Sequence, residues 1–213
     1  MGNVTIRDVR VINTRPSGAN LTVVKVETSE PGLYGLGCAT FAYRYLAVTE
    51  LVEKYLKPLL AGRNVSDIED MWQLMNSNSY WRNGPVTNNA ISGVDTALWD
   101  IKGKYHGVPA YELMGGPCRN SMKVYSWIGG DRPADVGKAA RARKEAGFTA
   151  IKMNATEELQ YIDSYEKVDA VLERVASIRE ETGKYFGIAI DFHGRVHKPM
   201  AKILAKKLEE YDP

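Results

Sequence analysis

The sequence predicts an α+β domain, a small sheet followed by a helical bundle, and after it the beginning of a parallel β/α domain. Two observations support this organisation. Apolar residues follow a strand-like period over the first forty residues and then recur with the helical period as far as Gly107. After Pro117, segments typical of strands and helices alternate three times. We therefore divide the chain into domains 1–118 and 119–213.

Three short strands are expected at the start of the chain. They lie near residues 4–11, 21–28 and 33–37. The turn between the last two contains Pro31 and Gly32, whose backbone preferences suit a tight reversal. An antiparallel sheet follows from these short connections.

Three helices are expected after the sheet, each with one apolar face. Ser66 and Glu69 predict a capping box at the start of the second helix, and Gly107 ends the third. The expected apolar faces are Val48, Leu51, Val52, Tyr55, Leu56, Leu59 and Leu60 in the first helix, Ile68, Met71, Trp72 and Met75 in the second, and Ala90, Ile91, Val94, Ala97, Leu98 and Ile101 in the third.

The second domain should contain three strand–helix units. Its strands are expected at residues 122–128, 148–153 and 186–191. Asp131, with Pro133 at the first helical position, should open the first helix. A complete (β/α)₈ barrel takes roughly 250 residues, many more than remain here. We expect either a barrel that stops after about three units or a small open sheet.

Charge and composition exclude several classes of function. The chain has 28 basic and 26 acidic residues without a basic block, so neither nucleic acid nor a membrane is an expected partner. No apolar run approaches the roughly 20 residues that span a bilayer, and a signal peptide is not recognisable. Cys38 and Cys118 lack metal-ligand spacing and should be buried or free thiols. We expect a cytoplasmic protein that acts on a small molecule.

Polar residues should meet at the C-terminal ends of the second and third strands of the β/α domain, where such domains bind ligands. Strand alternation places Lys152 and Asn154 on the side away from the helices. It places Asp191 and His193 on the same side of the next strand. A cation, an amide, a carboxylate and an imidazole together suit a carboxylate substrate beside a divalent metal.

Each candidate also has an ordinary structural explanation. An aspartate at a strand end often accepts loop hydrogen bonds, and an inward lysine can simply pair with it. His106 and His197 are expected on the surface rather than in catalysis. The aromatic stretch YWRNGP at residues 80–85 leaves two alternatives open, a substrate lid and packing between helices.

Several motifs resemble the mandelate racemase branch of the enolase superfamily. YWRNGPV at residues 80–86 and AISGVDTALWDIKGK at residues 90–104 are similar to mannonate dehydratase-like members. YSWIGGDRPADV at residues 125–136 and DFHGRV at residues 191–196 resemble galactonate dehydratase. The resemblance covers the whole chain. It implies an N-terminal capping domain followed by the start of a (β/α)₈ TIM barrel that ends after about three strand–helix units.

The resemblance implies a magnesium-dependent lyase that dehydrates a sugar acid. Asp191 matches the first of three acidic Mg²⁺ ligands, and His193 matches a general acid that protonates the departing 3-hydroxyl. Lys152 and Asn154 match the family's Lys-x-Lys position and would face the substrate. The remaining ligands and the base would lie beyond Pro213. Mg²⁺ would stabilise the charge left by the departing α-proton, and the product would be a 2-keto-3-deoxy sugar acid.

Galactonate is the preferred substrate on these motifs, and two departures from the family pattern argue against other members of the branch. Asn154 replaces the second lysine, which argues against racemisation. Ala42 stands where mannonate dehydratases tend to carry an asparagine. The alternatives are a mannonate or gluconate dehydratase, an acid-sugar racemase or epimerase, and a truncated non-catalytic binding or regulatory homologue. We also expect the complete enzyme to be a homo-oligomer, and the 213-residue chain alone to be inactive.

Overall fold

The alternating apolar residues at the start of the chain form a three-stranded antiparallel sheet in a computed structural model, which describes residues 2–130, 132–154 and 156–213. The strands are β1 (Ile6–Thr14), β2 (Leu21–Thr28) and β3 (Tyr34–Cys38), in the order β1-β2-β3. The prediction of three strands is confirmed. β1 begins later than expected and continues to Thr14.

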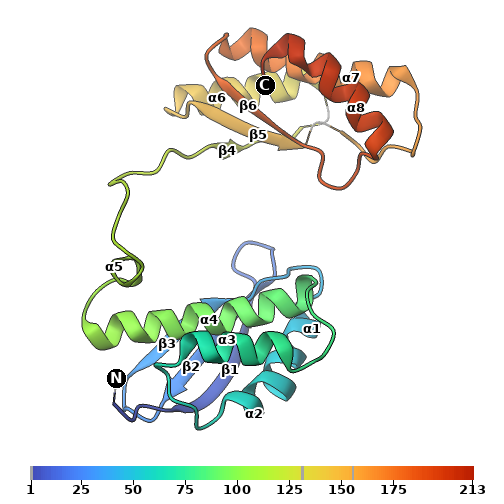
Figure 1. The fold of residues 1–213 in the computed structure, drawn as a ribbon. Helices are drawn as coiled ribbons and strands as arrows, with labels where there is room; N and C mark the ends of the chain where they lie inside the picture. The colour runs from blue at the N-terminus through green and yellow to red at the C-terminus, as the bar shows by residue number, and fades with distance from the viewer. Residues whose placement is uncertain (1, 131, 155) are drawn as a thin grey trace. The chain divides into compact units, whose positions relative to one another are not determined.

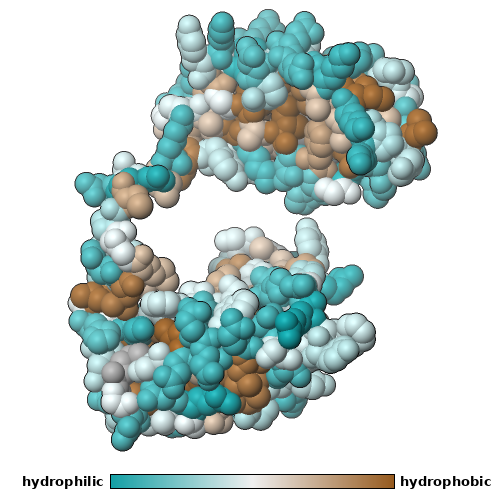
Figure 2. All heavy atoms as spheres, in the orientation of Figure 1, coloured by the Kyte–Doolittle hydropathy of each residue, from teal (hydrophilic) through white to brown (hydrophobic). Residues whose placement is uncertain are grey.

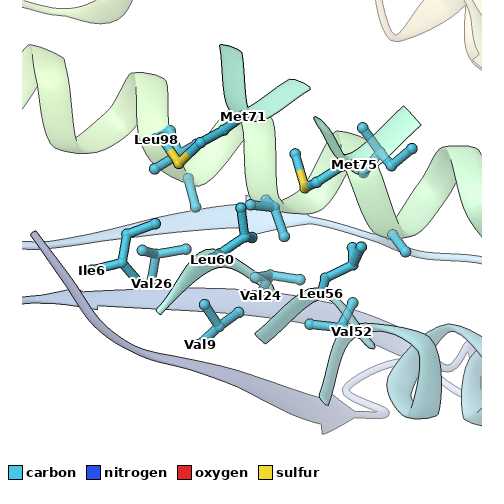
Figure 3. Close-up of a cluster of buried hydrophobic side chains, with 14 of the residues drawn as sticks. Ile6, Val9, Val24, Val26, Val52, Leu56, Leu60, Met71, Met75 and Leu98 are labelled. Carbon is cyan, nitrogen blue, oxygen red and sulfur yellow. The ribbon is translucent and has the colours of Figure 1, made fainter. Parts of the chain in front are cut away.

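A helical bundle follows the sheet. It consists of α1 (Tyr45–Glu50), the π-helical segment η1 (Leu51–Leu56), α2 (Lys57–Leu60), α3 (Ile68–Ser77), α4 (Pro85–His106) and the short α5 (Ala110–Leu113). Side chains from β1, β2, η1, α2, α3 and α4 meet in one apolar cluster (Figure 3). Burial of this cluster supplies the main driving force for folding of the first unit.

The first predicted helix contains a π-helical segment, and this changes which residues are buried. Val48, Val52, Leu56 and Leu60 are buried at a constant spacing of four. Tyr55, which we expected on the apolar face, is 65% exposed. A π-helical turn holds more residues than an α-helical turn, so the buried stripe moves away from the positions that a 3.6-residue period predicts.

The expected capping box at α3 is wrong. The helix begins at Ile68 with Asp67 as its N-cap, and the Asp67 side chain makes no capping hydrogen bond. The Ser66 N–H instead donates to Asn64 Oδ1 over 2.9 Å, because the chain makes a tight turn before the helix. Trp72 is 37% exposed and lies at the edge of the face that buries Met71 and its neighbours.

The third predicted helix is confirmed as α4, and all six of its predicted apolar residues are buried. Gly107 ends it in the left-handed conformation. β3 packs directly on this helix at two glycines. A Cβ at Gly35 would lie 1.9 Å from the Ala97 oxygen, and one at Gly37 would lie 1.9 Å from the Gly93 oxygen. Only glycine permits so close an approach of strand and helix.

The chain from Ser121 onward forms a second unit, and the first ends at Asn120. Its strands are β4 (Ser126–Trp127), β5 (Ala150–Asn154) and β6 (Gly187–Asp191), which form a parallel sheet in that order. Its helices are α6 (Pro133–Glu145), α7 (Tyr165–Thr182) and α8 (Lys198–Leu208), followed by a 3₁₀ turn, η2 (Glu209–Tyr211). Three strand–helix units are therefore present, as expected (Figure 1).

β4 is much shorter than the strand predicted at residues 122–128. Among the described strands it pairs with β5 alone, and Val124 and Tyr125 before it are 59% and 57% exposed. A strand with a partner on one side has fewer hydrogen bonds to hold its ends. α6 begins at Pro133 with Arg132 as its N-cap, while Asp131 lies outside the described residues.

The helices of the second unit cover one face of its sheet. Ile151, Met153 and Ile188 belong to its apolar cluster together with residues from all three helices. Hydrophilic residues cover most of the face of each unit that Figure 2 shows, with smaller apolar areas between them. In the part of the chain that the structure describes, every helix is too short or too polar to cross a bilayer.

Candidate functional site at the ends of β5 and β6

An ion pair joins the two neighbouring strands at their C-terminal ends. The register sets Lys152 beside Ala189 and Asn154 beside Asp191. Lys152 Nζ lies 2.6 Å from Asp191 Oδ2, and the two side chains are 30% and 25% exposed. Because Ile151 and Met153 face the helices, strand alternation leaves Lys152 on the open face, as we expected.

The two charges of this pair stabilise each other's ionised forms. The hydrogen bond from Lys152 is the largest influence on Asp191 and holds the pKa of that carboxyl well below its ordinary value. Bonds from the side chain and N–H of His193 add to this effect. The same bond to Asp191 raises the pKa of Lys152. Asp191 is therefore a carboxylate across the neutral pH range.

His193 reaches the carboxylate by a route that strand alternation did not predict. β6 ends at Asp191, and His193 lies in the turn that follows, at φ 47°. Its N–H donates to Asp191 Oδ1 over 2.8 Å, and its Nδ1 lies 3.2 Å from Asp191 Oδ2. The ring is half exposed. With Nδ1 engaged by the carboxylate, the ring is oriented so that Nε2 is the nitrogen left for a ligand.

Asn154 ends β5 and is half-buried. Among the described residues it makes no hydrogen bond to Lys152, Asp191 or His193. It lines a cavity of about 220 Å³ together with Trp127, Thr156, Arg174 and others. The structure thus brings three of the four predicted site residues into direct contact and places the fourth beside them.

The donor groups present fit only a part of a magnesium site. Asp191 is a partly exposed carboxylate at a strand end, which suits one bond to a hard cation. Within residues 2–130, 132–154 and 156–213, no group of three His, Cys, Asp or Glu side chains is placed to hold a metal. Asp191 can therefore supply one ligand, and a complete site needs ligands from elsewhere.

The other residues considered from sequence lie on the surface. His106 and His197 are exposed, as expected. Tyr80 and Trp81 are each 81% exposed, so packing between helices is wrong for these rings within the first unit. Cys38 and Cys118 are free, exposed thiols.

Sequence reasoning assigned no role to Arg195, which ties the turn of His193 to the neighbouring loop. Its Nη1 donates to the Thr156 oxygen over 3.3 Å, and its own oxygen accepts the Leu159 N–H over 2.9 Å. The glycine at position 194, three residues after the end of the strand, was an available signal for the turn. No local pattern indicates which loop an arginine beyond that turn contacts.

Two family profiles match this chain, one in each unit. The sequence profile of the mandelate racemase / muconate lactonizing enzyme N-terminal domain matches residues 3–115. That of the enolase C-terminal domain-like family matches residues 135–213. The chain belongs to the mandelate racemase / muconate lactonizing enzyme family.

Curated relatives carry dehydratase names. A D-galactonate dehydratase family member from Enterocloster bolteae is 41% identical over 99% of this chain and 57% of its own length. A D-galactonate dehydratase from Ralstonia pickettii is 47% identical over 89% of this chain and 49% of its own length. The chain thus spans about half the length of these curated relatives.

A solved structure from Pantoea ananatis is similar over nearly the whole chain. It is an enolase with bound D-gluconate and Mg, with a TM-score of 0.89 and 38% identity. The match covers 98% of this chain and 58% of that one. The curated relatives thus carry dehydratase names, and the solved relative binds a sugar acid together with Mg.

Proposed function

We propose that this chain carries part of the active site of a magnesium-dependent sugar-acid dehydratase, with D-galactonate as its substrate. The observation that carries the proposal is the contact of Lys152, Asp191 and His193 at the mouth of two parallel strands. This is the edge at which β/α barrels bind their substrates. The names of the curated relatives support the choice of reaction and substrate.

His193 is the proposed general acid. Its Nδ1 faces Asp191, so Nε2 would carry the proton to the 3-hydroxyl of the substrate. As that proton arrives, the C3–O bond breaks and water leaves. A base from outside these 213 residues would take the α-proton, and the resulting enol would tautomerise to a 2-keto-3-deoxy acid. A positioned acid of this kind contributes about 10²–10⁴-fold in rate.

Lys152 and Asn154 are the proposed substrate-facing residues. The Lys152 ammonium lies beside Asp191. The carboxylate of a bound sugar acid would therefore contact both this ammonium and a metal ion held by Asp191. Asp191 would be one Mg²⁺ ligand, and Mg²⁺ would stabilise negative charge on the substrate carboxylate. The bound D-gluconate and Mg of the Pantoea ananatis structure favour this metal, and they make D-gluconate the second candidate substrate.

The experiment is a screen of the protein, as its gene encodes it, against a library of sugar acids with Mg²⁺ and with EDTA. Formation of a 2-keto-3-deoxy acid from D-galactonate, abolished by EDTA, is the expected result. If the protein dehydrates D-gluconate and not D-galactonate, then D-gluconate is the substrate. Absence of a 2-keto product from every sugar acid would overturn the proposed function.

Further features of the complete protein stay predictions. They are the homo-oligomeric state, the cytoplasmic location, the domain limits 1–118 and 119–213, and a barrel of which this chain holds three strand–helix units.

A further inference from the structure

The turn that carries His193 has a backbone conformation that needs outside support. His193 and Gly194 have φ values of 47° and 68°, and the Arg195 N–H closes the turn on the Phe192 oxygen over 2.8 Å. Two consecutive positive φ values are typical of a type I′ turn, which is unfavourable for a residue with a Cβ. Gly194 meets this requirement easily, whereas His193 does not. Contacts around the turn must therefore hold His193 in place.

Arg195 supplies contacts to the loop that follows β5. Its guanidinium donates to the Thr156 oxygen, and its carbonyl accepts the Leu159 N–H. Both partners of Arg195 are firmly placed, since Thr156 and Leu159 are each 3% exposed. Two bonds from a single residue thus join the loop after Asn154 to the turn after Asp191.

Thr156 contributes its backbone, and not its side chain, to this contact. Among the residues that the structure describes, Thr156 Oγ1 is buried and has no hydrogen-bond partner, although a hydroxyl normally finds one. Its backbone oxygen, in contrast, accepts the bond from Arg195.

We propose that Arg195 is a positioning residue for the general acid. It holds the turn of His193 against the loop after β5, and so fixes the His193 ring relative to Lys152 and Asn154. This role rests on the proposed function of His193. In none of the contacts described does Arg195 touch the side chains of Asp191 or His193, so it acts through the backbone.

The test compares Arg195→Gln and Arg195→Lys with the unaltered protein, as its gene encodes it. Gln removes the charged donor, while Lys can still reach the Thr156 oxygen. A matched control is Arg15→Gln, because Arg15 also donates to a loop carbonyl, that of Gly18, but in the first unit. With D-galactonate, Arg195→Gln should lower kcat about tenfold or more and change KM less than about threefold. The loss in kcat should be smaller than the full contribution of a general acid, because the acid itself is still present. Arg195→Lys should recover most of kcat, and Arg15→Gln should match the unaltered protein.

Hydrogen exchange gives a readout that does not depend on activity. In Arg195→Gln, the amides of Leu159 and Arg195 should both exchange faster, whereas those of α7 should be unchanged. Two results for Arg195→Gln would overturn the positioning role in activity assays: an unchanged kcat, or a higher KM in place of a lower kcat. The role would also fail if Arg195→Lys did not restore kcat, or if the Leu159 amide of Arg195→Gln exchanged at the unaltered rate. If the unaltered protein dehydrates no sugar acid, the proposed function fails. In that case exchange alone decides whether Arg195 holds the two loops together.

Discussion

Lys152 Nζ lies 2.6 Å from Asp191 Oδ2, across two parallel strands that the chain connects through α7. The pair sets the charge of the candidate site, because the lysine hydrogen bond is the largest cause of the lowered Asp191 pKa. Lys152→Met should therefore raise the pKa of Asp191 toward its ordinary value. Carboxyl ¹³C NMR titration of the metal-free protein measures this. Lys206→Met, at an exposed position of α8, is the control and should leave the Asp191 pKa unchanged.

Glu27 makes a pH-dependent contribution to the stability of the first unit. Hydrogen bonds from Arg7 and Lys25 lower its pKa from 4.5 to about 2. A carboxyl with a depressed pKa in the folded state stabilises that state above its unfolded pKa, and the effect disappears as the pH falls through the folded pKa. Glu27→Gln should therefore be less stable than the unaltered protein at neutral pH. Urea unfolding of both proteins should show the difference shrinking between about pH 5 and about pH 2. A constant difference would refute this account.

Arg179 anchors the end of α7 and the end of the described chain. Its guanidinium donates to the oxygens of Gly183, Lys184 and Phe186, and to those of Tyr211 and Asp212. Arg179→Ala leaves these carbonyls without their charged donor, and should cost about 2–4 kcal/mol in the free energy of unfolding.

Denaturant unfolding, followed through the transition of the second unit, measures the loss of stability in Arg179→Ala. Arg143→Ala, at an exposed position of α6, is the control and should cost less than about 0.5 kcal/mol. Equal effects of the two substitutions would contradict the anchoring role.

The contact between β3 and α4 should tolerate no side chain at Gly35. A Cβ there would lie 1.9 Å from the Ala97 oxygen, so strand and helix would have to separate. Gly35→Ala should destabilise the first unit by about 3 kcal/mol or more. Leu36→Ala, at the next position and 42% exposed, should cost about 1 kcal/mol or less. Thermal unfolding separates the two, and a Gly35 variant as stable as the Leu36 variant would show that the contact is looser than described.

Much of the fold can be predicted from the periodicity of apolar residues. The prediction fails where the geometry of a helix departs from that of an α-helix. In α4 the 3.6-residue pattern identifies every predicted core residue correctly, because the helix is regular over its whole length. In η1 the same rule places Tyr55 inside although it is exposed. The π-helical geometry changes the number of residues per turn, which a count with a fixed 3.6-residue period does not anticipate.

The candidate site was only partly predictable for a similar reason. Lys152 follows from strand alternation, which is a local property of the backbone. The contact of His193 with Asp191 depends on a turn with positive φ, and the bond of Arg195 to Thr156 joins residues 39 positions apart. A sequence pattern contains residue types in order, whereas contacts between loops depend on the packing of whole strand–helix units.

The most direct test of the proposed chemistry is the dehydration of D-galactonate by the protein, as its gene encodes it, and by its His193→Asn variant. With Mg²⁺ present, the variant should lose about 10²–10⁴-fold in kcat for dehydration, because the departing hydroxyl would no longer receive a proton. The variant should largely retain Mg²⁺ binding, as measured by calorimetry, because Asp191 and not His193 is the proposed ligand. A variant that dehydrates D-galactonate within about threefold of the unaltered rate would remove His193 from the mechanism and contradict the account.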